Sequence, residues 1–112
     1  MPFFRFHFVE ESRLASVSRQ MAERIREVVG CPREHIVFEL IHSSAIHDGI
    51  IKTEGNWPFV EVEYFERPRE IQHEVARILY ECLNAAGYSD SDVYFRYLHS
   101  RNYYENGKCM EE

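Results

Sequence analysis

Hydrophobic residues recur along the chain with two different periods. Within residues 14–28 and again within residues 71–86 they return every three or four positions, with polar residues between them. This spacing predicts two amphipathic helices, each packing one face on a sheet. Ser12 is a candidate N-cap of the first helix, and Gly30 and Gly87 mark the ends of the two helices.

Four shorter stretches are rich in aromatic and β-branched residues, and we predict them to be strands. They cover residues 3–9, 36–41, 59–65 and 93–98. Phe4, Phe6 and Phe8 share one face of the first strand. Glu39 and Arg96 interrupt the otherwise apolar second and fourth strands.

Turn-forming pairs separate these elements. Residues 44–56 form a linker that contains the pairs Asp48-Gly49 and Gly55-Asn56. Near the end of the chain, Asn106-Gly107 predicts a tight hairpin between Tyr104 and Cys109.

The two halves of the chain align with one another. At a shift of 57 residues, the spacing between Gly30 and Gly87, residues 36–43 lie over residues 93–100 with phenylalanine, histidine and serine repeated. At a shift of 56, Pro2 lies over Pro58. We interpret residues 1–112 as one domain built from a duplicated β-α-β unit, with halves of about 2–43 and 58–100.

Each β-α-β unit joins parallel strands by a right-handed crossover, so both helices should cover one face of a four-stranded mixed sheet. This predicts an α+β sandwich. The other face of the sheet still carries apolar residues, and we expect it to pack on another subunit. A ferredoxin-like sandwich and a tautomerase fold share this order of elements, and the latter assembles as a trimer.

Composition excludes several classes of protein. The 112 residues include 19 acidic and 13 basic ones, for a net charge of −6, which argues against a nucleic-acid binder. The chain has neither an apolar run of about 18 residues nor a signal-peptide pattern, so we expect no membrane span and a cytoplasmic location. The three cysteines and six histidines form no metal-binding spacing, and we expect no metal or other cofactor.

The start Met1-Pro2, followed at once by an apolar strand, resembles the tautomerase superfamily, which includes macrophage migration inhibitory factor. The resemblance covers most of the chain and fits an uncharacterised bacterial branch best. It includes Pro2, the helix that ends at Gly30, the segment 31–36 and the strand segment 93–97. It implies a homotrimer in which a mature N-terminal Pro2 acts in a pocket between subunits.

The chemistry of Pro2 supports this implication. Removal of Met1 would expose a secondary amine, and an ordinary α-amino group has a pKa of about 7.7–8.0. Burial among Phe3, Phe4 and other aromatic rings would disfavour its charged form. The neutral amine could then act as a general base beside a carbonyl group, as in a keto-enol tautomerase or isomerase. Pro58, the counterpart of Pro2, is bonded to Trp57 and has no free amine.

Substrates of the superfamily are often 2-keto acids or their enols, which need a cation to hold the carboxylate. The candidates for substrate binding are Arg96, Tyr94, His35, Arg33 and Arg5. The resemblance implies Arg96 and Tyr94, because they match pocket positions of the cytokine-like relatives. Cys31 replaces their pocket lysine and His35 a tyrosine, so Arg33 or Arg5 would have to supply the missing charge.

Each candidate also has a structural interpretation. Arg96 is as well explained by an ion pair with Glu39 or Glu61, and Arg5 by a similar pair. Tyr94 suits a subunit interface. The functional alternatives are therefore a cofactor-independent tautomerase acting on a keto or enol acid, a non-catalytic oligomeric binding protein of the same fold, and a ferredoxin-like binding domain.

Overall fold

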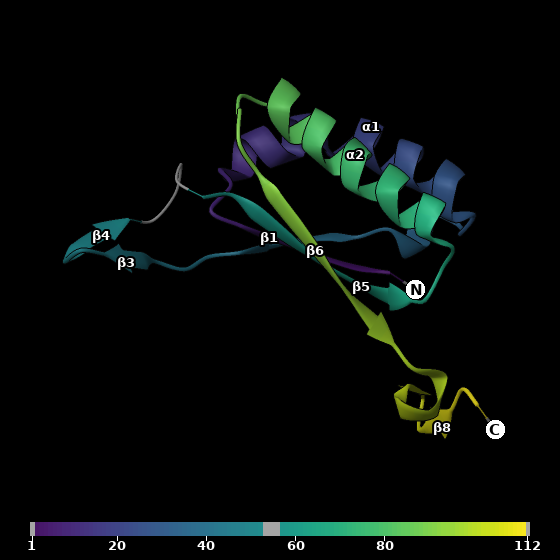
Figure 1. Cartoon of the computed structure of the whole chain (residues 1–112). Helices are drawn as coiled ribbons and strands as arrows, with labels where there is room; N and C mark the ends of the chain where they lie inside the picture. Colours follow the sequence, from purple (N-terminus) through teal and green to yellow (C-terminus); the bar gives the residue numbers. More distant parts are fainter. Residues whose placement is uncertain (1, 53–56, 112) are drawn as a thin grey trace.

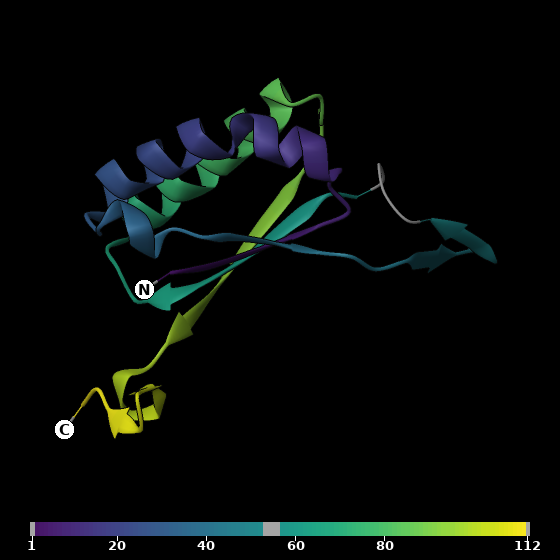
Figure 2. The same cartoon turned by 180° about the vertical axis from the view of Figure 1, so that it is seen from behind.

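In the computed structural model, two helices lie on one side of a four-stranded sheet (Figures 1 and 2). The structure describes residues 2–52 and 57–111. The strands are β1 (Phe3–His7), β2 (Phe38–Ile41), β3 (Ala45–His47), β4 (Ile50–Lys52), β5 (Phe59–Phe65), β6 (Asp92–Leu98), β7 (Tyr104–Glu105) and β8 (Lys108–Cys109). The helices are α1 (Glu11–Val29) and α2 (Arg69–Ala85), with short 3-10 helices η1 (Arg33–His35) and η2 (Ser100–Asn102).

The sheet has the strand order β2-β1-β5-β6. Strands β1 and β2 are parallel and joined through α1, while β5 and β6 are parallel and joined through α2. The two β-α-β units meet along the antiparallel pair β1 and β5. The predicted α+β sandwich, with two helices on one face of a mixed sheet, is therefore confirmed.

The core lies between the helices and the sheet. Phe4 and Phe6 of β1 are 1% and 0% exposed, and Val60, Val62 and Tyr64 of β5 are fully buried. Alternate residues of both strands are only partly buried. The alternation of side chains in a strand thus places the apolar set against the helices. The helices contribute apolar side chains of one face each: Leu14, Met21, Ala22, Ile25, Val75, Ile78, Leu79, Cys82 and Leu83.

The first helix begins before the position that the sequence favours. Glu10 is the N-cap, whereas Ser12 lies inside α1 and its hydroxyl donates to a Glu10 carboxylate oxygen at 2.7 Å. The prediction of Ser12 as the cap is therefore wrong. Gly30 ends α1 in the left-handed conformation as predicted, with φ of 78°. The second helix is capped by Ala86, one residue before the predicted Gly87.

Two strands are shorter than the apolar runs that predict them. β1 ends at His7, and Phe8 adopts a φ of 60°, which turns the chain out of the strand. Phe8 therefore does not share the regular face of Phe4 and Phe6. Residue Ile36 caps η1, so β2 begins only at Phe38. In contrast, β5 covers the predicted residues 59–65.

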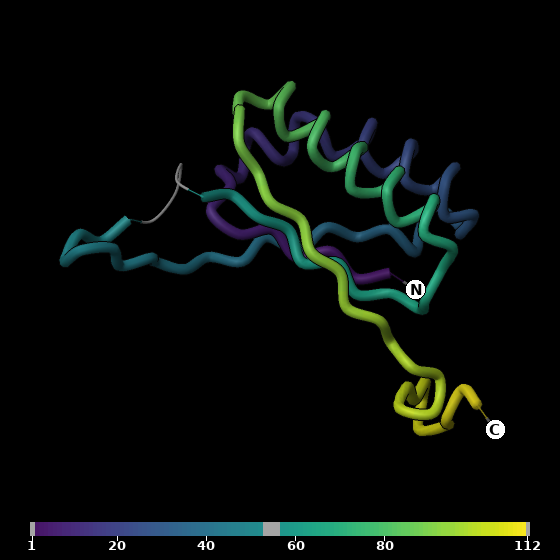
Figure 3. Tube along the Cα trace, viewed as in Figure 1, coloured from purple at the N-terminus to yellow at the C-terminus, as the bar shows by residue number. Residues whose placement is uncertain are grey.

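The predicted linker contains a hairpin of its own, β3 and β4, which extends away from the sheet (Figure 3). Asp48 and Gly49 form its turn, both with positive φ. The pair Gly55-Asn56 lies outside the described residues. The predicted C-terminal hairpin is confirmed as β7 and β8, with Asn106 and Gly107 in its turn. It lies beyond the end of β6, away from the hairpin of β3 and β4 (Figure 3).

The face of the sheet away from the helices has charged residues at its centre and apolar residues around them. Its central positions are Arg5, His7, Glu39, Glu61, Glu63 and Arg96. The prediction of apolar residues on this face is met by Phe3, Val37, Ile41, Phe59, Phe65 and Leu98. The charged centre holds the ion-pairing residues that the sequence suggested, Arg5 and Arg96 with Glu39 and Glu61, and so contains several of the candidate site residues.

Candidate functional site

Pro2 lies at the edge of a hollow of about 520 Å³ beside the start of β1. The hollow is mostly apolar, and its two side chains able to carry charge are those of His35 and Glu39. The lining residues are Pro2, Phe3, Phe4, His35, Val37, Phe38 and Glu39. It therefore combines Pro2, aromatic walls, an imidazole and a carboxylate.

The local fold explains this arrangement. Pro2 is buried at the start of β1, next to the partly buried Phe3. Gly30 turns the chain back from α1, and η1 then places His35 just before β2. Because β2 is parallel to β1, with Phe38 opposite Phe4, the start of both strands lies at one end of the sheet. Met1 lies outside the described residues, so the predicted removal of Met1 has no structural test.

Arg33 does not join this hollow. Its Nη1 atom lies 2.9 Å from a carboxylate oxygen of Glu23, and its Nη2 donates to the Arg19 carbonyl oxygen at 3.2 Å. Both partners belong to α1. Arg33 thus ties η1 to the first helix, although it lies only two residues before His35.

Arg5 lies next to the hollow but is paired with two carboxylates. Its Nη1 donates to Glu63 at 2.5 Å, and its Nε lies 3.3 Å from an oxygen of Glu39. The hydrogen bond to Glu63 raises the pKa of Arg5, and the charges of the nearby glutamates add to this effect, while burial partly opposes it. These contacts agree with the structural interpretation of Arg5, in which it forms ion pairs within the sheet.

Tyr94 and Arg96 meet Glu61 on the same face of the sheet. The Tyr94 hydroxyl donates to Glu61 at 2.6 Å, and an Arg96 nitrogen lies 3.8 Å from the same oxygen. The other Glu61 oxygen lies 2.5 Å from His7 Nε2. The hydrogen bonds from Tyr94 and His7 lower the pKa of Glu61, while the bond to Glu61 raises the pKa of Tyr94.

Within one chain, Tyr94 and Arg96 are separated from the Pro2 hollow by a strand. Arg96 pairs with Glu63 of β5, which pairs in turn with Phe3 of β1. Neighbouring strands are about 4.8 Å apart, so β6 lies roughly 10 Å from β1. The Arg96 side chain, 62% exposed, also leans toward Glu61. One chain therefore brings together Pro2 and His35, but not Tyr94, Arg96 or Arg33.

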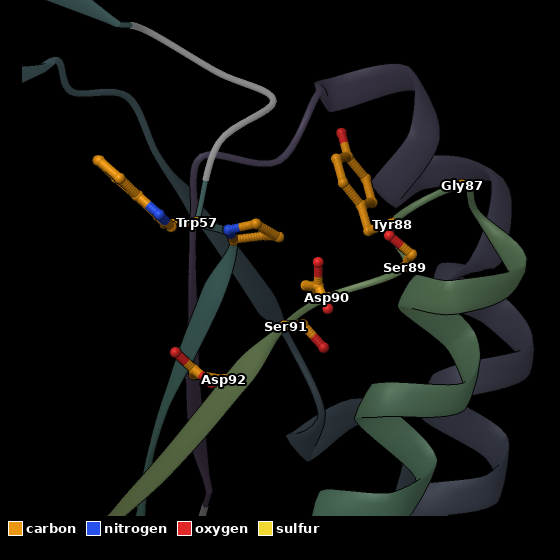
Figure 4. A pocket seen from close by; sticks show the side chains of 8 residues that line it. Trp57, Gly87, Tyr88, Ser89, Asp90, Ser91 and Asp92 are labelled. Carbon is orange, nitrogen blue, oxygen red and sulfur yellow. The ribbon is translucent and has the colours of Figure 1, made fainter.

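A second hollow, of about 320 Å³, lies at the start of β5 and β6 (Figure 4). It is lined by Trp57, Pro58, Gly87, Tyr88, Ser89, Asp90, Ser91 and Asp92. When the two halves are aligned, Pro58 takes the place of Pro2 and Asp92 that of His35. The Pro58 nitrogen is part of the amide bond to Trp57, so this second hollow cannot present a free proline amine.

Sequence reasoning missed that Glu39 lines the Pro2 hollow and that His7 pairs with Glu61. The signal for Glu39 was present, since it is a carboxylate within an apolar run. Its position beside Pro2 depends on the register of β1 and β2, which places Arg5 opposite Glu39. The His7 and Glu61 pair joins residues 54 positions apart, and no local pattern indicates it.

Residues 2–52 and 57–111 contain no group of histidine, cysteine, aspartate or glutamate side chains arranged to hold a metal ion. In the same residues, neither helix is long and apolar enough to cross a membrane.

The sequence matches the family described as "Domain of unknown function (DUF1904)" over residues 1–109. The chain belongs to the DUF1904 family. A comparison with curated proteins gives no match.

Solved structures resemble the DUF1904 chain over nearly its whole length. The DUF1904 domain from Sebaldella termitidis ATCC 33386 has a TM-score of 0.86 and 24% identity, covering 97% of this chain and 99% of the other. A protein of unknown function from Vibrio cholerae O1 biovar eltor has a TM-score of 0.82 and 25% identity, covering 96% and 86%. Pt0534 inactivated by 2-oxo-3-pentynoate has a TM-score of 0.76 and 11% identity, covering 97% of each chain.

Further structural matches are a fused 4-OT trimer, a macrophage migration inhibitory factor-like protein from Entamoeba histolytica and malonate semialdehyde decarboxylase, with identities of 12% to 13% and TM-scores of 0.65 to 0.76. These proteins belong to the tautomerase superfamily. The DUF1904 chain thus has the tautomerase fold that its sequence predicts.

Proposed function

We propose that this protein is a cofactor-independent tautomerase in which the N-terminal amine of Pro2 acts as the general base on an enolisable keto compound. The observation that carries the proposal is the position of Pro2, buried at the start of β1 and lining an apolar hollow. The tautomerase fold of the chain supports it further.

The reaction would proceed by two proton transfers. The neutral amine removes a proton from the carbon next to the carbonyl group, and the resulting ammonium returns it at another position. Burial beside Phe3 and Phe4 disfavours the charged amine and so favours the basic form. His35, on the same hollow, can hydrogen-bond to the carbonyl oxygen as negative charge develops there.

A homotrimer would complete the site. Tyr94 and Arg96 do not reach the hollow of their own chain, but we propose that a neighbouring subunit presents them there to the carbonyl oxygen of the substrate. Exposed apolar side chains on the two projecting hairpins support such an assembly: Ile46, Ile50, Ile51, Tyr104 and Met110 are 51% to 75% exposed. A solved structure of fused 4-OT is described as a trimer. The unpaired thiols Cys31, Cys82 and Cys109 are consistent with the cytoplasm as the proposed compartment.

The intact mass of untagged protein, expressed with its natural start, tests the first requirement. We expect a chain that begins at Pro2. A chain that keeps Met1 would have no free proline amine, and the catalytic proposal would be abandoned.

An enol-keto assay with phenylpyruvate tests the chemistry. We expect Pro2→Ala to reduce kcat/KM by about 100-fold or more, the usual contribution of a positioned base. Pro58→Ala is the matched control, because it removes another buried proline whose nitrogen is an amide. Equal rates for Pro2→Ala and the parent protein would refute the proposed role of Pro2.

Covalent labelling gives a second measurement. A solved structure of Pt0534 is described as inactivated by 2-oxo-3-pentynoate. If Pro2 carries a nucleophilic amine, the same reagent should add to this chain at its N-terminal peptide, with a mass increase of one reagent molecule. Labelling elsewhere, with Pro2 unmodified, would contradict the proposal.

A non-catalytic binding protein of the same fold is the alternative. It is favoured by the engagement of Arg5, Arg33 and Arg96 with carboxylates, since none of these contacts requires a substrate. It predicts a stable oligomer with no turnover by either the parent protein or the Pro2→Ala variant.

A further inference from the structure

Glu39 gives the Pro2 hollow a negative charge at its rim. It lies on β2 directly opposite Arg5 of β1, and it lines the hollow together with Pro2 and His35. Its side chain is 61% exposed, so a molecule entering the hollow would meet the carboxylate rather than a covered salt bridge.

The nearest arginine does not cancel this charge. Arg5 is shared between Glu63, at 2.5 Å, and Glu39, at 3.3 Å. The shorter contact is to Glu63, which is only 25% exposed. One guanidinium therefore faces two carboxylates, and the cluster carries a net charge of −1 when all three groups are ionised.

Among the described residues that line the hollow, none is an arginine or lysine. Arg33, which is close in sequence, is directed to Glu23 and the backbone of α1. A substrate carboxylate placed beside Pro2 would consequently approach Glu39 without a cation from the same chain to offset the repulsion.

We propose that Glu39 makes the Pro2 hollow selective for uncharged carbonyl compounds over those that carry a carboxylate. This inference rests on the proposed function and narrows its substrate class to ketones, aldehydes or esters with an apolar body. Phe3, Val37 and Phe38 supply the apolar surface for that body, and His35 the hydrogen bond to its oxygen. Like charges held close together disfavour binding, which gives Glu39 its discriminating effect.

A matched pair of ligands tests the proposal. Phenylpyruvate and its methyl ester have the same aromatic body and the same keto group, and differ in the carboxylate charge. Binding is followed by NMR through the ring-proton resonances of His35, assigned by their loss in the His35→Gln variant. We expect the parent protein to bind the ester about fivefold more tightly, the upper range for one partly exposed charge interaction. The preference should shrink at high salt.

The variant Glu39→Gln removes the charge and keeps the shape of the side chain. It should bind phenylpyruvate about fivefold more tightly and leave the affinity for the ester unchanged. Glu34→Gln is the control, because Glu34 is an exposed residue of η1 that does not line the hollow. It should change neither affinity by as much as twofold, and the unfolding midpoints of both variants are measured alongside.

The proposal is overturned if the parent protein binds the acid as tightly as the ester, if Glu39→Gln leaves the preference unaltered, or if neither ligand shifts the His35 resonances. Failure of the proposed catalysis has a different signature. In that case the ester binds preferentially and Glu39→Gln removes the preference, but turnover is absent or insensitive to Pro2→Ala.

Discussion

The Nε2 atom of His7 lies 2.5 Å from a carboxylate oxygen of Glu61, and both side chains are only 15% exposed. The imidazole also stacks on the Phe59 ring, with 4.2 Å between the ring centres. The second oxygen of Glu61 accepts the hydroxyl proton of Tyr94 at 2.6 Å. Glu61 thus joins β1, β5 and β6 at the centre of the open face of the sheet.

This arrangement predicts a loss of stability in acid. Hydrogen bonds from Tyr94 and His7 hold the pKa of Glu61 below its ordinary value of 4.5 in the folded chain. The resulting stabilisation is therefore complete above the unfolded pKa and is lost as the pH falls through the folded pKa. We expect Glu61→Gln to lose about 1–2 kcal/mol at neutral pH and to show a smaller further loss below about pH 4. Urea unfolding over a pH series measures both effects.

The control for this experiment is Glu66→Gln, because Glu66 is exposed beyond the end of β5. It should keep the acid response of the parent protein. If Glu61→Gln also keeps the full response, the carboxylate of Glu61 is not the group responsible.

Removal of the Tyr94 hydroxyl should shift the same acid transition. The bond from Tyr94 is the largest of the contacts that lower the pKa of Glu61. We expect Tyr94→Phe to lower the free energy of unfolding by about 1 kcal/mol and to move the acid-induced loss to higher pH. Tyr80→Phe, on the exposed face of α2, is the matched control and should change neither quantity. If Tyr94→Phe leaves the acid transition unaltered, the Tyr94 hydroxyl does not contribute to the stabilising effect of Glu61.

The fold was largely predictable because its signals are local. The strict alternation in residues 59–65 predicts β5 with its observed ends, and the apolar spacing predicts both helices. Local competition explains two errors. Ser12 donates its hydroxyl to the Glu10 carboxylate instead of capping the helix. The Ile36 amide bonds back to the Arg33 carbonyl at the end of η1, so β2 begins two residues later than the apolar run.

The site was less predictable because it depends on contacts between distant positions. The sequence left Glu39 and Glu61 as equal candidates for an ion pair with Arg96. The register of β5 and β6 places Arg96 near Glu61. Likewise, Arg5 and Glu63 are 58 residues apart and meet only across the antiparallel strands. The residue types indicated that ion pairs would form, but the register of the strands determines which residues pair.

A buried hydroxyl predicts a substitution that stabilises the protein. Tyr64 is fully buried, and its hydroxyl has no hydrogen-bond partner among the described residues. In Tyr88, which is 8% exposed, the hydroxyl accepts a hydrogen bond from the Glu10 amide at 2.8 Å. We therefore expect Tyr64→Phe to raise the free energy of unfolding by about 1 kcal/mol and Tyr88→Phe to lower it by a similar amount. Equal losses in both variants, measured by urea unfolding, would show that the Tyr64 hydroxyl makes a stabilising contact.

The two glycines that follow the helices should differ in their tolerance of a side chain. Both have positive φ, 78° at Gly30 and 107° at Gly87, so alanine is strained at either position. A methyl group at Gly30 would meet nothing within 4 Å, whereas at Gly87 it would lie 2.5 Å from Arg13 Nη1. That guanidinium donates to the Ala86 carbonyl at 3.3 Å and lies over the Tyr88 ring.

We expect Gly30→Ala to cost about 1 kcal/mol and Gly87→Ala about 2 kcal/mol, because the φ of Gly87 lies farther from the left-handed minimum and its new methyl group also displaces the end of Arg13. A double-mutant cycle with Arg13→Ala separates the two contributions. In the Arg13→Ala background, Gly87→Ala should cost less than in the parent protein, while the cost of Gly30→Ala should stay the same. If the cost of Gly87→Ala is unchanged without Arg13, the difference between the two glycines arises from the backbone conformation alone.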